Sequence, residues 1–113
     1  MSSIFTKILN KEIPSEIIYE DENFFAIHDI HPSAPIHVLL ITKKEIATLE
    51  DIPEEDAALV GKLFSTARIV AKKLGIQKNY KLVMNVGREV QEVHHIHLHI
   101  RGGWDLKKPP AKT

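Results

Sequence analysis

The feature that most constrains this chain is a run of alternating histidines and aliphatic residues near its C-terminal end. Three histidines alternate with aliphatic residues in this run, namely His95, His97 and His99. Successive side chains of a β-strand point to opposite faces of a sheet, so this period of two predicts a strand over 94–101. The three histidines then share one face, which is expected to line a cleft, and the aliphatic residues face the core.

Length, charge and cysteine content narrow the class of protein. The chain has 113 residues, which fits one domain over 1–113 with a C-terminal tail from about 104. The absence of cysteine excludes disulfides, thiolate metal ligands and a cysteine nucleophile. Fifteen basic and 15 acidic residues balance, which argues against a nucleic-acid partner. No transmembrane run or secretory signal is recognisable, so we expect a cytoplasmic protein without a membrane partner.

The N-terminal half predicts one short helix and three strands. Apolar residues at helical spacing indicate a helix over 4–13, ended by Pro14. The strands that follow are expected over 17–20, 24–28 and 36–41. A loop with two prolines, 29–35, separates the last two of them.

The C-terminal half predicts a long helix over 52–74 and two more strands, over 80–86 and 94–101. Asp51 and Glu54 resemble a capping box at the start of that helix. Its apolar stripe consists of Val60, Leu63, Ala67, Val70 and Leu74. Short connections favour antiparallel neighbours, so the expected fold is α+β, with a mainly antiparallel five-stranded sheet and one long and one short helix.

Three interpretations of the histidine face compete. It could be a solvated strand face without a role. It could hold zinc, which needs ligands that converge at about 2.0–2.1 Å on one point. Neighbours on one strand face lie about 6.6–7 Å apart, so zinc would use two of them and an outside group such as His28, Asp29 or His37. Finally, it could be catalytic, because neutral imidazole is a nucleophile and a proton shuttle near pH 7.

The motif His95-Ile96-His97-Leu98-His99-Ile100, followed by Gly102-Gly103, resembles the signature of the histidine triad superfamily. Three other segments are similar to that family in the same order, namely 4–14, 28–37 and 82–87. The pair of glycines after the triad points to the branch of histidine triad nucleotide-binding proteins, called Hint.

This resemblance implies a purine nucleoside phosphoramidate hydrolase that releases AMP or GMP and an amine through a nucleotidyl-histidine intermediate. It implies a homodimer whose two sheets join into one, and it implies no cofactor and no metal. Two alternatives stay open: a dinucleoside polyphosphate hydrolase, and a nucleotide- or zinc-binding regulatory protein with little catalysis.

The resemblance also assigns residues. His97 would be the nucleophile, His95 would orient it, His99 would contact the phosphate, and His37 would support the triad. Asp29 would accept hydrogen bonds from the ribose, and Asn85 would lie on the phosphate or ribose side. The residues expected to enclose the base are Phe5, Ile8, Ile27, Ile30 and Leu39.

The segment 87–93 departs from the family pattern. It is one residue short and poor in glycine, and Glu92 stands where many relatives carry a hydroxyl. A carboxylate beside a phosphate is unfavourable, so we expect Glu92 to act through its backbone N–H. The tail has its own sequence, in which Trp104 and Lys107 could shape specificity across the dimer.

Overall fold

The computed structural model describes residues 2–106 and contains two α-helices, two 3₁₀ turns and five strands. In chain order they are α1 (Ile4–Leu9), β1 (Tyr19–Glu20), β2 (Phe24–His28), β3 (Ile36–Thr42), turns at Leu49–Asp51 and Glu54–Asp56, α2 (Ala58–Lys73), β4 (Tyr80–Val83) and β5 (His97–Gly102). The sheet has the order β1-β2-β3-β5-β4, and every neighbouring pair is antiparallel. The predicted α+β fold with a five-stranded antiparallel sheet is therefore confirmed.

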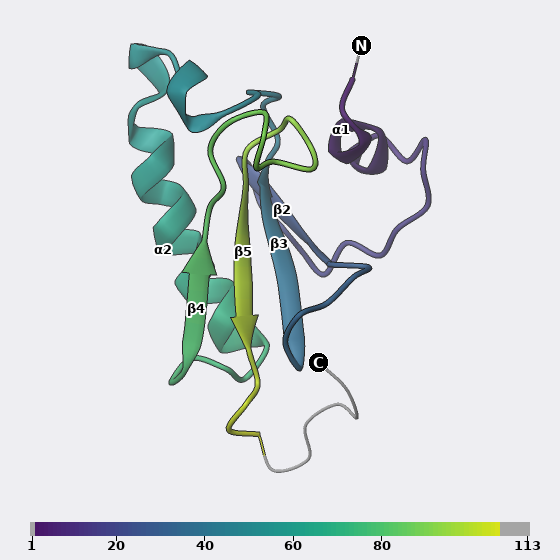
Figure 1. Cartoon of the computed structure of the whole chain (residues 1–113), viewed down its shortest axis with the longest axis vertical. Coiled ribbons are helices and arrows are strands. Elements are labelled where there is room, and N and C mark those ends of the chain that lie inside the picture. The colour runs from purple at the N-terminus through teal and green to yellow at the C-terminus, as the bar shows by residue number, and fades with distance from the viewer. Residues whose placement is uncertain (1, 107–113) are drawn as a thin grey trace.

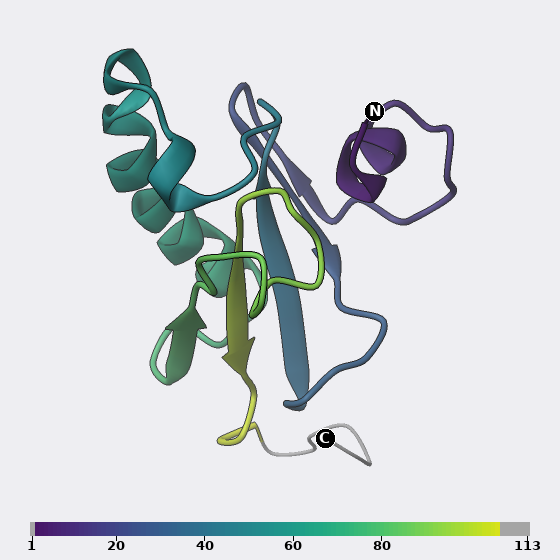
Figure 2. The same ribbon diagram turned by 45° about the horizontal axis from the view of Figure 1, so that its top comes forward.

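The alternation along the central strands sorts side chains onto two faces of the sheet. On one face Ala26, Leu40 and Leu98 pack with α2 in the larger apolar cluster. On the other face Ile27 and Leu39 pack with α1 in a smaller apolar cluster. Figures 1 and 2 show α2 lying along one face and α1 standing over the other. The histidines of β5 alternate with Leu98, so they point to the face that α1 partly covers.

The predicted stripe of α2 is the side that packs on the sheet. Leu63, Ala67 and Val70 are buried, while Val60 and Leu74 at the two ends of the stripe are half-buried. Burying a leucine or valine side chain contributes about 1.5–3 kcal/mol, so Leu63 and Val70 hold α2 against the sheet.

The predicted start of this helix is wrong. α2 begins at Ala58, and no side chain caps it, so the capping box at Asp51 does not form. Asp51 instead ends a 3₁₀ turn, and Ile52 has an extended backbone with ψ 120°. The cause is Pro53, because a proline disfavours the helical conformation in the residue before it.

Other boundaries also differ from the expectation, since β5 begins at His97 rather than at residue 94. α1 ends at Leu9 rather than at residue 13, because Lys11 adopts a left-handed backbone with φ 64°. β1 is limited to Tyr19–Glu20, and β4 ends at Val83, where its pairing with β5 stops. Within the tail predicted from about 104, Trp104 is described, whereas Lys107 lies outside the described residues. No helix in the range 2–106 is long and apolar enough to cross a membrane.

Candidate active site

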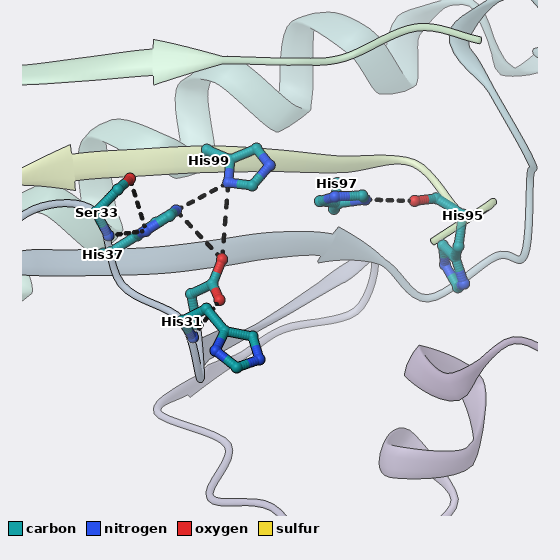
Figure 3. A network of polar contacts seen from close by, with 7 residues as sticks. His31, Ser33, His37, His95, His97 and His99 are labelled. Atoms are coloured by element: carbon teal, nitrogen blue, oxygen red, sulfur yellow. Dashed lines mark hydrogen bonds and ion pairs between the residues drawn. The ribbon is translucent and has the colours of Figure 1, made fainter. Parts of the chain in front are cut away.

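The register between the central strands brings the histidines together. β3 pairs with β5 so that Leu39 is opposite His99 and Ile41 is opposite His97. His37 lies further along β3 and reaches the ring of His99 diagonally, with ring centroids 5.1 Å apart. Figure 3 shows His37, His99 and His97 projecting from these two adjacent strands. A local pattern on each strand therefore becomes one cluster only through strand pairing.

A cavity of about 360 Å³ opens next to this cluster. Its lining includes two of the triad histidines, His97 and His99, together with the acidic residues Asp29 and Glu92. All five residues expected to enclose a base also line it: Phe5, Ile8, Ile27, Ile30 and Leu39. The cavity thus combines an apolar part beside α1 with a polar part beside β5.

His97 has a defined tautomer. Its Nδ1 lies 2.7 Å from the backbone carbonyl oxygen of His95, which can only accept a hydrogen bond. In the neutral ring the proton is therefore on Nδ1, and Nε2 keeps a free lone pair. The ring is 7% exposed and packs edge-on against Phe5 at 5.1 Å. His97 is held as a neutral imidazole with its basic nitrogen available.

A chain of hydrogen bonds also fixes the protons of His37 and His99. The backbone N–H of Ser33 donates to Nδ1 of His37 over 3.0 Å, so the proton of His37 is on Nε2. That Nε2–H donates to Nδ1 of His99 over 2.8 Å. The remaining nitrogen of His99, Nε2, then carries its proton. His99 is a hydrogen-bond donor where His97 offers a lone pair.

Burial keeps these rings neutral. Desolvation lowers the pKa of His99 to about 4, and the neighbouring His97, His37 and Arg101 add to the shift. The pKa of His97 is also lowered by burial, although its hydrogen bond to the His95 carbonyl and the charge of Asp29 oppose the shift. Burial lowers the pKa of His37, against the charge of Asp29. All three imidazoles are therefore uncharged at pH 7.

The first histidine of the triad lies apart from the strand face. His95 precedes the start of β5 and is fully buried. Its Nε2 donates to the carbonyl oxygen of Thr42 over 2.7 Å, so its Nδ1 accepts from the hydroxyl of Ser3 over 2.6 Å. Ser3 also caps α1 by accepting from the N–H of Thr6. The expectation that all three histidines line the cleft is wrong for His95, which anchors α1 instead.

Asp29 follows directly on β2 and is only partly buried. Its Oδ1 accepts from the backbone N–H of His31 over 2.8 Å, which orients the carboxylate. Its Oδ2 lies 3.4 Å from Nε2 of His37 and 4.0 Å from Nδ1 of His99. Asp29 therefore sits between the cavity that it lines and the supporting pair of histidines.

Asp29, His37 and His99 are the described residues whose ligand atoms come close enough for a metal, all within 4.8 Å of one another. Their hydrogen bonds argue against such a site. Binding through Nε2 would require His37 to lose the proton there, yet its Nδ1 already accepts from the Ser33 N–H. A metal would therefore leave two N–H donors facing each other or require an imidazolate.

Two of the residues predicted for the site lie at the margin of the cavity or outside its lining. Ile30 lines the cavity but is 86% exposed. Asn85 is half-buried beyond the end of β4 and is not among the residues that line the cavity, although Val83, two residues earlier, is the strand partner of His99.

Sequence reasoning missed a residue that fixes the loop before the triad. Gln91 is buried, and its side-chain oxygen accepts from the N–H of Gly87 over 2.8 Å. Its amide nitrogen donates to the carbonyl oxygens of Ala47 and Val93. These bonds tie the loop to the rest of the chain and so position Glu92 beside the cavity. A buried glutamine carries no periodic signal, so only the structure identifies it.

Comparison with known proteins agrees with the fold and identifies the family. The family model described as HIT domain matches residues 10–105. An uncharacterized HIT-like protein of Synechocystis sp. is 49% identical over 110 residues, which cover 96% of each chain. Among solved structures, a HIT family hydrolase from Legionella pneumophila is 41% identical, with a TM-score of 0.84 over 96% of this chain and 99% of that one. A histidine triad nucleotide-binding protein from Candida albicans is 33% identical, with a TM-score of 0.77 over 88% of this chain and 73% of that one. This chain therefore belongs to the HIT domain family.

Proposed function

We propose that this protein is a purine nucleoside phosphoramidate hydrolase of the Hint branch, and that it releases AMP or GMP and an amine. The observation that supports it most is the tautomer of His97, whose unprotonated Nε2 belongs to a ring that lines the cavity. The Candida neighbour is named as a nucleotide-binding protein and the Legionella neighbour as a hydrolase, which supports the same class of activity.

The cavity suits the parts of a nucleotide in order. The purine packs in the apolar part of the cavity, which Phe5 of α1 and Leu39 of β3 both line. The carboxylate of Asp29 accepts hydrogen bonds from the ribose hydroxyls. The phosphate then reaches His97 and His99, and the substrate needs no cofactor or metal for the reaction that follows.

In the first step, the lone pair on Nε2 of His97 attacks phosphorus and the P–N bond breaks. The departing nitrogen takes up one proton from solvent water and leaves as an amine. The resulting nucleotidyl-His97 is cationic in its ring, and the carbonyl oxygen of His95 stabilises it by accepting the Nδ1–H bond. The Nε2–H of His99 and the backbone N–H of Glu92 donate to the phosphate oxygens, where negative charge collects.

In the second step, water attacks the same phosphorus, and the bond to His97 breaks. The hydroxyl group of the water remains on phosphorus. The other proton of the water replaces the proton that the amine took up. The products are a nucleoside monophosphate and a neutral His97. Asn85 lies on the phosphate or ribose side in this arrangement, and His37 keeps Nδ1 of His99 occupied so that Nε2 faces the substrate.

We also propose that the chain forms a single domain over 1–113 and that two copies of it form a homodimer. We expect this dimer to work in the cytoplasm. β4 is an edge strand of the sheet, so it offers unpaired backbone groups to a second copy. The adjacent α2 exposes two large apolar side chains, Phe64 at 42% and Ile69 at 54%. A two-fold pairing of β4 and α2 would cover both features and continue the sheet.

A turnover assay tests the function. The native protein, His97→Ala and His94→Ala are offered an adenosine 5′-phosphoramidate and a diadenosine polyphosphate, each with a chelator. His94 is the matched control because it is exposed and does not line the cavity. We expect phosphoramidate cleavage that is lost only in His97→Ala. Preference for the dinucleotide would move the protein to the alternative hydrolase class, and no turnover of either would favour a binding role.

A further inference from the structure

Two acidic side chains line the cavity beside the histidines, namely Asp29 and Glu92. Within residues 2–106, no lysine or arginine belongs to this lining. The donors proposed above for the phosphate oxygens, the ring of His99 and the backbone N–H of Glu92, are both neutral. Each further negative charge on a substrate would therefore meet carboxylates without a cation in the lining to balance it. A cavity of this composition suits a substrate with a single phosphate group.

The two carboxylates lie toward opposite ends of the histidine cluster. The backbone N–H of Asp29 donates to the carbonyl oxygen of His37 over 3.0 Å, near the start of β3. His97 lies further along the sheet, at a register position near the end of β3. The loop that contains Glu92 precedes β5, and Gln91 ties this loop to the segment that follows β3. Along the direction of the strands, His97 therefore lies between Asp29 and Glu92.

The charge of Glu92 reaches the nucleophile. Burial lowers the pKa of His97, and the charges of Asp29 and Glu92 both oppose that shift. Asp29 is oriented by the backbone N–H of His31 and lies close to His37. The side chain of Glu92, in contrast, is exposed and joins no ion pair among the residues that the structure describes. This leaves the carboxylate of Glu92 available to a substrate group.

The position of Glu92 matches the leaving side of the proposed substrate. In an in-line displacement, the departing nitrogen lies on the side of phosphorus opposite Nε2 of His97. That side faces the cavity, because the ring of His97 is part of the lining. The ribose at Asp29 occupies the end of the cavity toward His37. The group beyond phosphorus therefore extends toward the other end, where Glu92 lies.

We propose that the carboxylate of Glu92 determines leaving-group specificity, favouring an amine that carries a second, positively charged group and disfavouring a leaving group that carries phosphate. This inference rests on the proposed hydrolase function and names its substrate class. A carboxylate attracts an ammonium group and repels a phosphate, and salt screens both effects. Because Glu92 is exposed, the expected attraction is that of a surface ion pair.

Two substrates of equal length test this role. They are the adenosine 5′-phosphoramidates of pentylamine and of diaminobutane, whose chains end in a methyl and in an ammonium group, respectively. The ratio of kcat/KM for the ammonium substrate to that for the methyl substrate is measured at low and at high salt. Diadenosine triphosphate is the phosphate-bearing arm.

The variants are Glu92→Gln, which removes the charge, and Glu92→Asp, which keeps it on a shorter side chain. Glu89→Gln is the matched control, because Glu89 is exposed in the same loop and does not line the cavity. A change in folding alone would affect both phosphoramidates equally and would not depend on salt. The ratio and its salt dependence therefore report the charge of Glu92 specifically.

The native protein should prefer the ammonium substrate by roughly 2- to 5-fold at low salt, the range of an exposed ion pair, and salt should reduce this preference. Glu92→Gln should lose the preference and should cleave diadenosine triphosphate faster relative to the methyl substrate. Glu92→Asp should keep part of the preference, and Glu89→Gln should keep all of it. A preference that survives in Glu92→Gln, or unchanged discrimination against the triphosphate, would overturn the role of Glu92.

The specificity and the hydrolase function fail separately. Equal turnover of the two phosphoramidates by the native protein at low salt would overturn the role of Glu92 even if no variant folded, and it would leave the hydrolase function standing. Absence of turnover of both phosphoramidates would contradict the hydrolase function, and the specificity proposal with it.

Discussion

Nδ1 of His97 lies 2.7 Å from the backbone carbonyl oxygen of His95, and this contact determines which nitrogen of His97 carries the proton. A carbonyl oxygen only accepts hydrogen bonds. If the proton of His97 moved from Nδ1 to Nε2, this buried hydrogen bond would be lost. The triad is therefore organised by its backbone as well as by its side chains, and the role of His95 is divided. Its carbonyl orients His97, while its ring is bonded to Ser3 and Thr42.

Replacing His37 should reduce catalysis without removing the nucleophile. In His37→Leu, Nδ1 of His99 loses the donor that lies 2.8 Å away, so His99 no longer has one preferred tautomer. We expect kcat to fall by up to about 100-fold, as for a misplaced catalytic group, with a smaller change in KM. Steady-state kinetics beside His94→Leu checks this, and an unchanged kcat would show that His99 needs no support from β3.

Removing the Ser3 hydroxyl should loosen α1 and the triad together. Ser3 caps α1 and donates to His95, so Ser3→Ala loses both contacts, whereas Ser3→Thr keeps a hydroxyl. The lost cap alone costs about 1 kcal/mol of unfolding free energy. Because α1 carries Phe5 and Ile8, KM should also rise. Urea unfolding and kinetics test this against Ser2→Ala, whose serine is exposed, and equal behaviour of the two variants would refute the link.

Stability should rise with pH between about 5 and 7. The pKa values of His37, His95, His97 and His99 are lowered in the folded protein, chiefly by burial, and that of His99 falls to about 4. The unfolded chain, with histidine pKa near 6.5, therefore binds more protons than the folded one below pH 6.5. The stabilisation is complete above that pH and is lost as the pH falls toward 4. A urea midpoint that stays constant from pH 5 to 7 would contradict it.

Metal removal should leave turnover unchanged. His37 donates its only proton toward His99 and accepts from Ser33, so the cluster with Asp29 is arranged for hydrogen bonding. Dialysis against a chelator is expected to preserve kcat/KM, and added zinc is expected to inhibit by displacing that proton. Activity that disappears on chelation and returns with stoichiometric zinc would require a different account of the site.

The sequence predicted most of the parts that depend on local periodicity. Short apolar runs predicted the strands over 24–28 and 36–41, and the alternation of histidines with aliphatic residues predicted a strand over 94–101, which begins only at His97. The helical stripe around Leu63 and Val70 identified the face of α2 that packs on the sheet. The start of α2 was missed because Asp51 and Glu54 matched a capping signal that the backbone before Pro53 cannot use. Helix 4–13 was too long because nothing in the residue type of Lys11 indicates its left-handed backbone.

The contacts that connect distant segments were not predictable in the same way. A serine before an apolar helical pattern signals a helix cap, but the bond from Ser3 to His95 joins residues 92 positions apart. The donor role of Ser33 toward His37 likewise depends on how loop 29–35 folds back on β3. The tautomer of His99 follows from the register of β3 and β5, which brings Nε2 of His37 to its Nδ1 and which a single sequence does not specify.

The most direct test of the account is to trap the covalent intermediate on His97. The protein is mixed with excess adenosine 5′-phosphoramidate, quenched in base at intervals from milliseconds to seconds, and analysed by intact mass and peptide mapping. We predict a mass gain of one adenylyl group that forms at least as fast as turnover, maps to His97 and is absent from His97→Ala. Steady turnover without an adduct at any time, together with activity in His97→Ala, would contradict it.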